Sequence, residues 1–355
     1  MHLIDLLSWR STPAAGVSIG LTRRCPLHCA HCSTSSTPHS EEHPAALFER
    51  FVDSFSVDCR PEVLSMSGGE AMLRPGLVRS LAERARRAGT KTSVLSGLFF
   101  ARFAAIPAGI KAAIEAVDHF SVSLDEFHER EVPRADVFRV LEQVLARGTH
   151  VSMHLVGHGA EDPYVEGLVA DVRLRFGAQV PMLVNNVSHF GRARTWLRRK
   201  DGARLPQADA NPCMMAAWPV VGFDGRIAAC GNDDAMDHLP AHLRLGHAAE
   251  DSWATIRDRT RASSMMRALR LLGPEYVAER YQSEARGCSG YCGTCLGLSG
   301  DAVLMDRVDA LMSRPTAAVL EETASALQQQ AGALAFLRRY TIPRYAELAT
   351  LGAPV

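Results

Sequence analysis

Short apolar runs alternate with amphipathic segments over the first half of the chain. The runs are rich in Val, Ile and Leu, and in the segments between them apolar residues recur three or four positions apart, which is the helical period. Strands that alternate with helices predict a parallel sheet with right-handed crossovers. The expected strands span residues 17–22, 63–67, 92–96, 119–124, 150–156 and 182–187.

Six strand–helix units favour an α/β fold built as an open, partial (β/α)6 TIM-type barrel over a closed barrel of eight strands. In such barrels the residues that carry chemistry lie at the carboxyl ends of the strands. The barrel is predicted to occupy residues 1–200. Its helices are expected over residues 44–56, 76–88, 101–116, 136–147 and 164–176.

The second half of the chain is organised differently. Residues 201–212 are polar and contain Pro and Gly, which is typical of a linker. The sequence VVGFDGRIAAC predicts a β-hairpin that turns at Asp224-Gly225 and brings Cys213 close to Cys230. We expect a small cysteine-rich domain over residues 213–300. Apolar residues at helical spacing then predict helices over residues 301–355, packed on the rest of the chain or on a second copy of it.

Charge and composition narrow the function. The 355 residues include 39 Lys and Arg and 39 Asp and Glu, and this zero net charge favours neither nucleic acid nor a membrane surface as a partner. We find no signal peptide and no apolar run of about eighteen residues, so we expect a cytoplasmic protein without a membrane-spanning helix. Because cytosolic thiols stay reduced, the nine cysteines favour metal ligation over disulfides.

Three cysteines follow the first expected strand. Cys25, Cys29 and Cys32 have the spacing C-x3-C-x2-C. Thiolates are soft ligands that suit iron–sulfur clusters, and three of them hold three corners of a 4Fe–4S cube while its fourth iron stays open. A structural zinc site, with His28 or His31 as the fourth ligand, is the alternative.

Polar residues follow the second strand and line one face of the fourth. After the second strand, two glycines let the backbone turn sharply and approach a ligand, and the next residue is a glutamate that accepts hydrogen bonds from an ammonium group. Along the fourth strand, polar residues at alternate positions face the barrel interior, where they contact a cofactor or substrate or merely bond to one another. These candidates are Gly68, Gly69, Glu70, Ser121, Ser123 and Asp125, and Asp125 is also a candidate catalytic residue.

The fifth and sixth strands add three candidates. His154 shares the inward face of its strand and is a candidate catalytic residue, although a lone inward histidine is more often a satisfied core group. Asn185 ends the sixth strand, and Arg192 follows within a Gly-Arg-Ala sequence. The guanidinium of Arg192 suits either a carboxylate of the cofactor or an interdomain ion pair.

Five further cysteines lie late in the chain, and a second 4Fe–4S cluster needs four ligands. The spare cysteine leaves the assignment open, and Cys288 is the least certain ligand. A zinc site formed by the same residues is the alternative. The preferred ligands are Cys213, Cys230, Cys292 and Cys295.

The early cysteine motif, the Gly-Gly-Glu sequence and the SLD-x-x-HE sequence at 123–129 together resemble the radical S-adenosylmethionine (radical SAM) superfamily. The resemblance implies that the open iron binds the methionine part of S-adenosylmethionine, that Glu70 and its glycines hold the amino group, and that His31 packs near the adenine. It also implies that flavodoxin or ferredoxin supplies an electron that cleaves S-adenosylmethionine. The resulting 5′-deoxyadenosyl radical takes a hydrogen atom from the substrate.

The late cysteines, with Leu245-Gly246 and Trp253 among them, resemble SPASM and twitch auxiliary domains. Their number implies a single auxiliary 4Fe–4S cluster, the twitch-like case. Such enzymes often oxidise, crosslink or epimerise ribosomally made peptides, and others act on small natural-product metabolites. We therefore expect a radical SAM oxidoreductase that acts on a peptide or, as the alternative, on a small metabolite. In a peptide epimerase the spare Cys288 is a candidate hydrogen-atom donor. A non-catalytic iron–sulfur or zinc protein is the rival from another class.

Overall fold

The structure is a computed structural model that describes residues 1–198, 209–283 and 290–354. Within these residues one sheet of nine strands has the order β6-β5-β4-β3-β2-β1-β7-β8-β9. Neighbours are parallel from β6 to β7, and β8 and β9 then add antiparallel. The strands are β1 Gly16–Gly20, β2 Val63–Ser67, β3 Lys91–Ser96, β4 His119–Ser123, β5 His150–Gly157, β6 Met182–Asn186, β7 Val220–Val221, β8 Arg226–Ala228 and β9 Arg244–His247.

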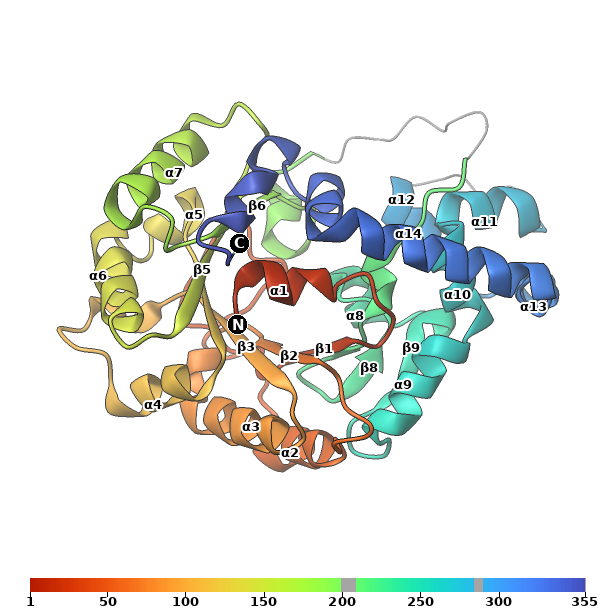
Figure 1. Cartoon of the computed structure of the whole chain (residues 1–355), viewed down its shortest axis with the longest axis horizontal. Coiled ribbons are helices and arrows are strands. Elements are labelled where there is room, and N and C mark those ends of the chain that lie inside the picture. The colour runs from red at the N-terminus through yellow and green to blue at the C-terminus, as the bar shows by residue number, and fades with distance from the viewer. Residues whose placement is uncertain (199–208, 284–289, 355) are drawn as a thin grey trace.

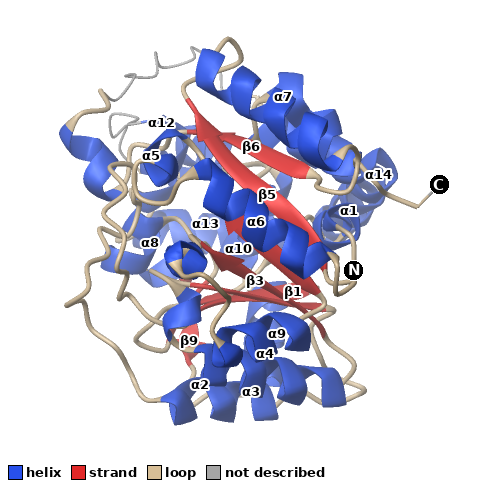
Figure 2. Ribbon diagram, turned by 90° about the vertical axis from the view of Figure 1, so that its left-hand side faces the viewer, coloured by secondary structure: helices blue, strands red, loops and turns tan. Residues whose placement is uncertain are grey.

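Strands β1 to β6 and the helices between them form the expected open (β/α)6 barrel. The crossover helices α2, α3, α4, α6 and α7 lie outside the strands (Figures 1 and 2). These helices are amphipathic: α3, for example, buries five apolar residues spaced to form one face. The helices of this half are α1 Leu3–Ser8, α2 Ala45–Asp53, α3 Pro75–Arg87, α4 Ala108–Ala116, α5 Glu126–Glu129, α6 Arg134–Leu145 and α7 Pro163–Phe176.

One crossover helix is shorter than the sequence predicts. The helix expected over residues 101–116 begins only at Ala108, and Phe99–Arg102 form a separate 3-10 turn. Pro107 stands immediately before the helix, and its ring nitrogen has no proton to donate to a preceding turn, so a continuous helix cannot pass through it.

The strand register places the carboxyl ends of the strands at one edge of the barrel. Gly20 lies beside Ser67, Ser123 beside His154, and Gly157 beside Asn186. The loops after these strands therefore meet at the same edge, where the sequence analysis expects the chemistry.

The predicted hairpin is present and is joined to the barrel. Strands β7 and β8 are antiparallel, and Gly225 in the turn between them has a positive φ of 88°, which glycine adopts without strain. Because β7 also pairs in parallel with β1, the second half of the chain continues the sheet of the first. Its helices are α8 Asp233–His238, α9 Trp253–Ala262, α10 Ser264–Leu271, α11 Pro274–Tyr281, α12 Gly290–Leu296, α13 Ala302–Met312 and α14 Pro315–Tyr340.

The expected helical tail packs across the barrel edge. Helix α14 crosses α1 (Figure 1), and the two share an apolar cluster that includes Leu3, Phe336 and Leu337. The chain after α14 covers the free edge of β6, where the Ile342 amide donates to the Val184 carbonyl at 2.9 Å. Among the described helices, none is both long and apolar enough to cross a membrane.

Candidate functional site

A cavity of about 380 Å³ lies at the carboxyl ends of the strands. Its wall is built by the loops after β1, β2 and β3 and by the ends of β4, β5 and β6. Ten of the residues proposed from the sequence line it: Cys25, Cys29, His31, Cys32, Gly68, Gly69, Glu70, Ser123, Asn185 and Arg192.

The three early thiols lie on one loop beside the cavity. Cys25 and Cys29 are buried and Cys32 is half-buried, and burial raises the pKa of the Cys25 thiol to about 12. Three soft sulfur donors on one loop suit three corners of an iron–sulfur cluster.

Arg192 fixes the loop that carries these cysteines. Its Nε donates to the Cys29 carbonyl at 2.9 Å, its Nη1 donates to the Ser36 carbonyl at 2.6 Å, and its backbone amide donates to the Cys32 carbonyl at 3.0 Å. Gly191, at φ 49°, packs so closely on this loop that a Cβ there would overlap the carbonyls of Cys32 and Ser33. The guanidinium thus binds backbone oxygens, and the expected pairing with a cofactor carboxylate stays a prediction.

The two glycines after β2 allow two loops to touch. The Gly69 amide donates to the Thr22 carbonyl at 2.7 Å, and the Glu70 amide donates to the Arg24 carbonyl at 2.9 Å. A Cβ on Gly69 would lie 2.6 Å from the carbonyl oxygen of Arg23, and Gly68 has a φ of 146°. Side chains at these two positions would push away the segment that leads into the cysteine loop.

The carboxylate of Glu70 is bound by the chain itself. Its Oε1 accepts hydrogen bonds from the Met72 amide and the Ser96 hydroxyl, both at 2.9 Å, and its Oε2 accepts one from the Gly97 amide at 2.8 Å. Burial raises the pKa of Glu70, and these three donors oppose that rise. The side chain therefore ties the loop after β2 to the end of β3, and a direct bond to an ammonium group stays a prediction.

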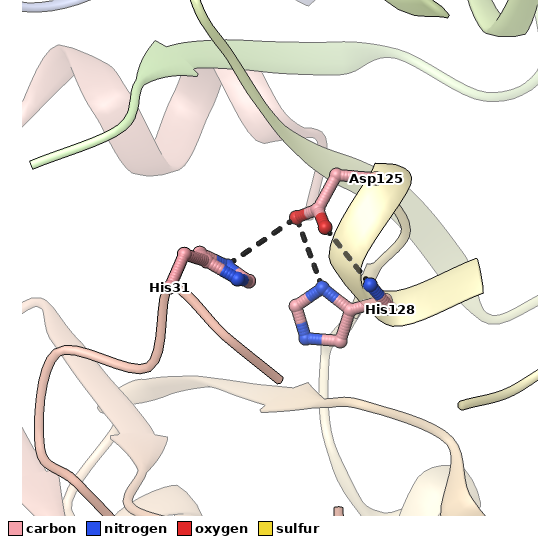
Figure 3. Close-up of side chains that lie close together, drawn as sticks. All are labelled: His31, Asp125 and His128. Carbon is pink, nitrogen blue, oxygen red and sulfur yellow. Dashed lines mark hydrogen bonds and ion pairs between the residues drawn. The ribbon is translucent and has the colours of Figure 1, made fainter. Parts of the chain in front are cut away.

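Asp125 holds two histidines at the rim of the site (Figure 3). It caps α5, where its Oδ1 accepts hydrogen bonds from the backbone amides of Phe127 and His128 at 2.9 and 3.0 Å. Its Oδ2 lies 2.9 Å from Nδ1 of His128 and 3.5 Å from Nε2 of His31. The carboxylate is fully buried. Asp125 does not line the cavity but positions residues that do, so its expected catalytic role stays a prediction.

The pKa values of Asp125, His128 and His31 depend on their burial and on their charged neighbours. Burial pushes the pKa of Asp125 upward, but the neighbouring histidines outweigh it and hold that pKa below its ordinary value. Burial opposes protonation of His128 as well, yet Asp125 and the hydrogen-bonded Cys29 thiol raise the pKa of His128 to about 10. Burial lowers the pKa of His31 to about 4, so this ring is neutral near pH 7.

An aromatic wall continues from His31. Its ring stacks on Phe127 with centroids 4.6 Å apart, and Phe127 in turn lies 5.4 Å from the ring of Trp196. The Trp196 indole donates to the Ala30 carbonyl at 3.0 Å and leaves 39% of the residue exposed. The wall offers flat apolar faces beside the cysteine loop, as a ring-bearing ligand requires. The predicted contact of His31 with adenine stays a prediction.

Ser121 and His154 lie on β4 and β5 but are not among the residues that line the cavity. The Ser121 hydroxyl is 3.0 Å from that of Ser152, which is also 2.8 Å from Nε2 of His119, so this polar group is satisfied within the barrel. His154 differs because its buried Nε2 has no hydrogen-bond partner among the described residues, and burial lowers the pKa of His154 to about 4. Val156, two residues further along the same strand face, lines the cavity.

Sequence reasoning left several lining residues out of the candidate site. His128 and Gly97 line the cavity, and so does Asn186 beside the predicted Asn185. The signal for His128 was available, because an N-cap aspartate with a histidine three residues later puts both side chains at the start of one helix. Gly97 gave no such signal, since its role depends on the buried Glu70 from another strand.

The late cysteines gather at the other end of β1. Cys213 precedes a 3-10 turn, Cys230 follows β8, and Cys292 and Cys295 lie on α12. Burial raises the pKa of the Cys295 thiol, and the charges of the other three thiols raise it further, so all four lie within electrostatic reach of one another. Cys288 falls outside the described residues.

A buried cation accompanies these thiols. Nη1 of Arg10 is buried without a hydrogen-bond partner in the described part of the chain. The thiols of Cys230 and Cys213 are the groups with the largest electrostatic effect on this guanidinium. An orphaned cation beside four thiols fits an anionic group held between them, as a thiolate-ligated cluster would be.

Comparisons with known proteins agree with this geometry. Residues 19–172 match the family model of the radical SAM superfamily. The crystal structure of Streptococcus suis SuiB bound to S-adenosylmethionine aligns with a TM-score of 0.53 and 13% identity, over 86% of this chain and 76% of that chain. SuiB bound to precursor peptide SuiA aligns with a TM-score of 0.51 and 13% identity, over 85% of this chain and 75% of that chain.

A third structure, that of polyhistidine-tagged anSMEcpe with bound AdoMet, aligns with a TM-score of 0.50 and 12% identity, over 90% of this chain and 98% of that chain. At these identities the likeness establishes the fold. No functionally curated protein matches the sequence.

Proposed function

Because residues 19–172 match the radical SAM superfamily, we propose that the chain is an enzyme that cleaves S-adenosylmethionine reductively and removes a hydrogen atom from a ribosomally made peptide. The single observation that carries the proposal is the cavity at the strand ends. Three thiols line it together with the close-packed Gly-Gly-Glu turn. An electron carrier or a structural metal site needs no such ligand cavity beside its thiols.

The first cluster is proposed to be held by Cys25, Cys29 and Cys32. When bound with S-adenosylmethionine it supplies the electron that generates the 5′-deoxyadenosyl radical, with flavodoxin or ferredoxin as the source. The chain positions the reactants. Arg192 and the glycine turn hold the cysteine loop in place. The wall of His31, Phe127 and Trp196 is proposed to bound the adenine, and it excludes water from one side of the cavity.

The methionine end of the cofactor is proposed to contact the strand ends. Among the described residues, the carbonyl oxygens of Gly68 and Gly69 accept no hydrogen bond, so they are free to accept from an ammonium group. Ser123, Asn185 and Asn186 line the opposite side of the cavity and offer hydroxyl and amide donors for a carboxylate or a ribose.

A second cluster is proposed at residues 213–300, held by Cys213, Cys230, Cys292 and Cys295. Their mutual electrostatic reach and the orphaned Arg10 cation support it. This part of the chain would then be a twitch-like auxiliary unit. With these four as ligands, Cys288 is left over and is proposed as the hydrogen-atom donor if the reaction is an epimerisation.

A peptide is the proposed substrate class. SuiB, whose fold this chain shares, has been solved with its precursor peptide SuiA, and this supports the choice over a small metabolite. Within the barrel, the unpartnered Nε2 of His154 is neutral near pH 7 and is proposed to bond the substrate or accept its proton.

The test is anaerobic reconstitution with iron and sulfide, followed by S-adenosylmethionine and dithionite, with 5′-deoxyadenosine quantified by mass spectrometry. We expect its formation by the native chain and by Cys59→Ala, a half-buried cysteine outside both thiol groups, and its loss in Cys29→Ala. Retained release in Cys29→Ala, or none in the native chain, refutes the proposal.

A further inference from the structure

Two nitrogen-bearing side chains face the late thiols, and the proposed function gives neither of them a task. They are Arg10, which follows α1, and His242, which lies in the 3-10 turn before β9. They lie far apart in the sequence. Nε2 of His242 lies 3.9 Å from the Cys295 sulfur, while Arg10 lies over Trp218 with its Nη1 buried and unpartnered within the described residues.

The Arg10 guanidinium is held in place over an indole ring. Its Cζ lies 4.7 Å from the ring centroid of Trp218, and the Trp218 indole donates to the Trp9 carbonyl at 2.9 Å. A second hydrogen bond joins the same two segments of the chain, from the Ala14 amide to the Ala217 carbonyl at 2.8 Å. The guanidinium therefore has a fixed orientation, with Nη1 buried and unpartnered within the described residues.

This cation remains charged although it is buried. An arginine side chain stays protonated in proteins, so the buried Arg10 carries a positive charge. A buried charge is costly unless an opposite charge lies nearby. When the thiols are deprotonated as metal ligands, they supply the negative charge that the buried guanidinium requires.

His242 directs an N–H group at a thiol. The ring is buried, with Nδ1 2.8 Å from the Ser299 hydroxyl and Nε2 3.9 Å from the Cys295 sulfur. If Ser299 donates to Nδ1, the ring proton sits on Nε2 and points at the sulfur, an assignment made from the hydrogen-bond network. A partner on the far nitrogen fixes ring orientation in this way at many metal sites.

We propose that Arg10 and His242 are positioning residues that stabilise the reduced form of the cluster held by Cys213, Cys230, Cys292 and Cys295, and so raise its reduction potential. The inference rests on the proposed second cluster. One-electron reduction adds one negative charge to the cluster and its thiolates. A fixed cation and an N–H donor gain more from the more negative state, and in a buried site this difference is weakly screened.

The test uses the full chain with Cys25, Cys29 and Cys32 all changed to alanine, so that only the second cluster can form. After anaerobic reconstitution, iron is counted and the midpoint potential is measured by dithionite titration followed by electron paramagnetic resonance. Arg10→Gln removes the cation and Arg10→Lys keeps it. His242→Phe removes the N–H and His242→Gln keeps it. Arg79→Gln is the control, since Arg79 is exposed and its one ion pair within the described residues is with Glu83.

We expect Arg10→Gln and His242→Phe each to shift the oxidised-to-reduced equilibrium about tenfold toward the oxidised form, which is about 59 mV for one electron. Arg10→Lys and His242→Gln should restore most of the midpoint potential of the chain with the three early cysteines changed to alanine. Arg79→Gln should leave that potential unchanged. If Arg10→Gln fails to fold, the lysine variant and the His242 pair decide.

Unchanged potentials with about four irons bound overturn the inference and leave the proposed function standing. If the chain with the three early cysteines changed to alanine binds no iron, the proposed second cluster is refuted. The inference, which rests on that cluster, is then refuted as well. A shift that neither conservative variant recovers would assign the effect to altered packing, which also contradicts the inference.

Discussion

Nδ1 of His128 lies 2.9 Å from Oδ2 of Asp125. The other oxygen of that buried carboxylate, Oδ1, accepts two backbone hydrogen bonds and so caps the helix that carries the histidine. The arrangement makes Asp125 part of the scaffold of the site. It links the end of β4 to the cysteine loop through His31 (Figure 3). The predictions below treat the residues around the cavity as such a scaffold.

Asp125→Ala should destabilise the fold more than Asp125→Asn. The alanine variant leaves two amides and a buried histidine without an acceptor, and removing one partner of a buried pair costs about 3–5 kcal/mol. Asparagine keeps one oxygen as an acceptor, so its cost should be about 1–3 kcal/mol. Urea unfolding of the iron-free chain measures both. Glu83→Gln, which breaks an exposed ion pair with Arg79 on α3, is the control and should leave the free energy of unfolding almost unchanged.

His128 should make stability depend on pH. Its pKa is raised to about 10 in the folded chain, above the ordinary 6.5 of the unfolded one, because Asp125 overcomes the effect of burial. The stabilisation is therefore complete below about pH 6.5 and is lost as the pH rises toward 10.

The measurement for His128 is the difference in unfolding free energy between the native chain and His128→Asn, both free of iron. We expect this difference to shrink from pH 6.5 to pH 10. A difference that stays constant or grows over that range would show that the pKa of His128 beside Asp125 is not raised in the folded chain.

Gly69→Ala should prevent the first cluster from binding. The added methyl group would lie 2.6 Å from the Arg23 carbonyl oxygen, so the segment entering the cysteine loop must move. Gly76→Ala is the matched control, because the space around Gly76 on α3 is open and alanine favours a helix by about 1 kcal/mol. Iron content after reconstitution and thermal unfolding distinguish the two. Equal iron in both variants would contradict the packing argument.

Arg192→Ala should loosen the cysteine loop and speed the loss of iron to a chelator. The side chain makes two hydrogen bonds to loop carbonyls, and lysine can replace only one of them, so Arg192→Lys should lie between alanine and the native chain. Arg79→Ala, at an exposed ion pair on α3, should behave as the native chain does. Iron release at the native rate from Arg192→Ala would mean that the loop is held by other contacts.

Much of this architecture could be predicted from local patterns in the sequence. In the strand Val63–Ser67, Leu64 and Met66 are buried on one face while the two serines on the other face are partly exposed. The Asp-Gly turn closes the β7–β8 hairpin because glycine tolerates its positive φ. The cavity also follows from local signals, since each motif stands directly after a strand and parallel strands end at one edge.

What sequence patterns could not give is the partner of each polar side chain. Glu70 and Arg192 have the chemistry of ligand-binding residues, yet their partners are Ser96, Gly97 and the loop carbonyls. These contacts join segments far apart in the chain. Arg10 is a similar case, because its burial beside the late thiols depends on β7 pairing with β1.

The most direct test of the account is whether S-adenosylmethionine binds at the cluster of Cys25, Cys29 and Cys32. Electron paramagnetic resonance of the dithionite-reduced, reconstituted chain measures this before and after the nucleoside is added. We predict that the signal of one cluster changes on addition, and that the change is absent in Cys29→Ala and present in Cys59→Ala. A spectrum that S-adenosylmethionine leaves unaltered in the fully loaded native chain would contradict the account.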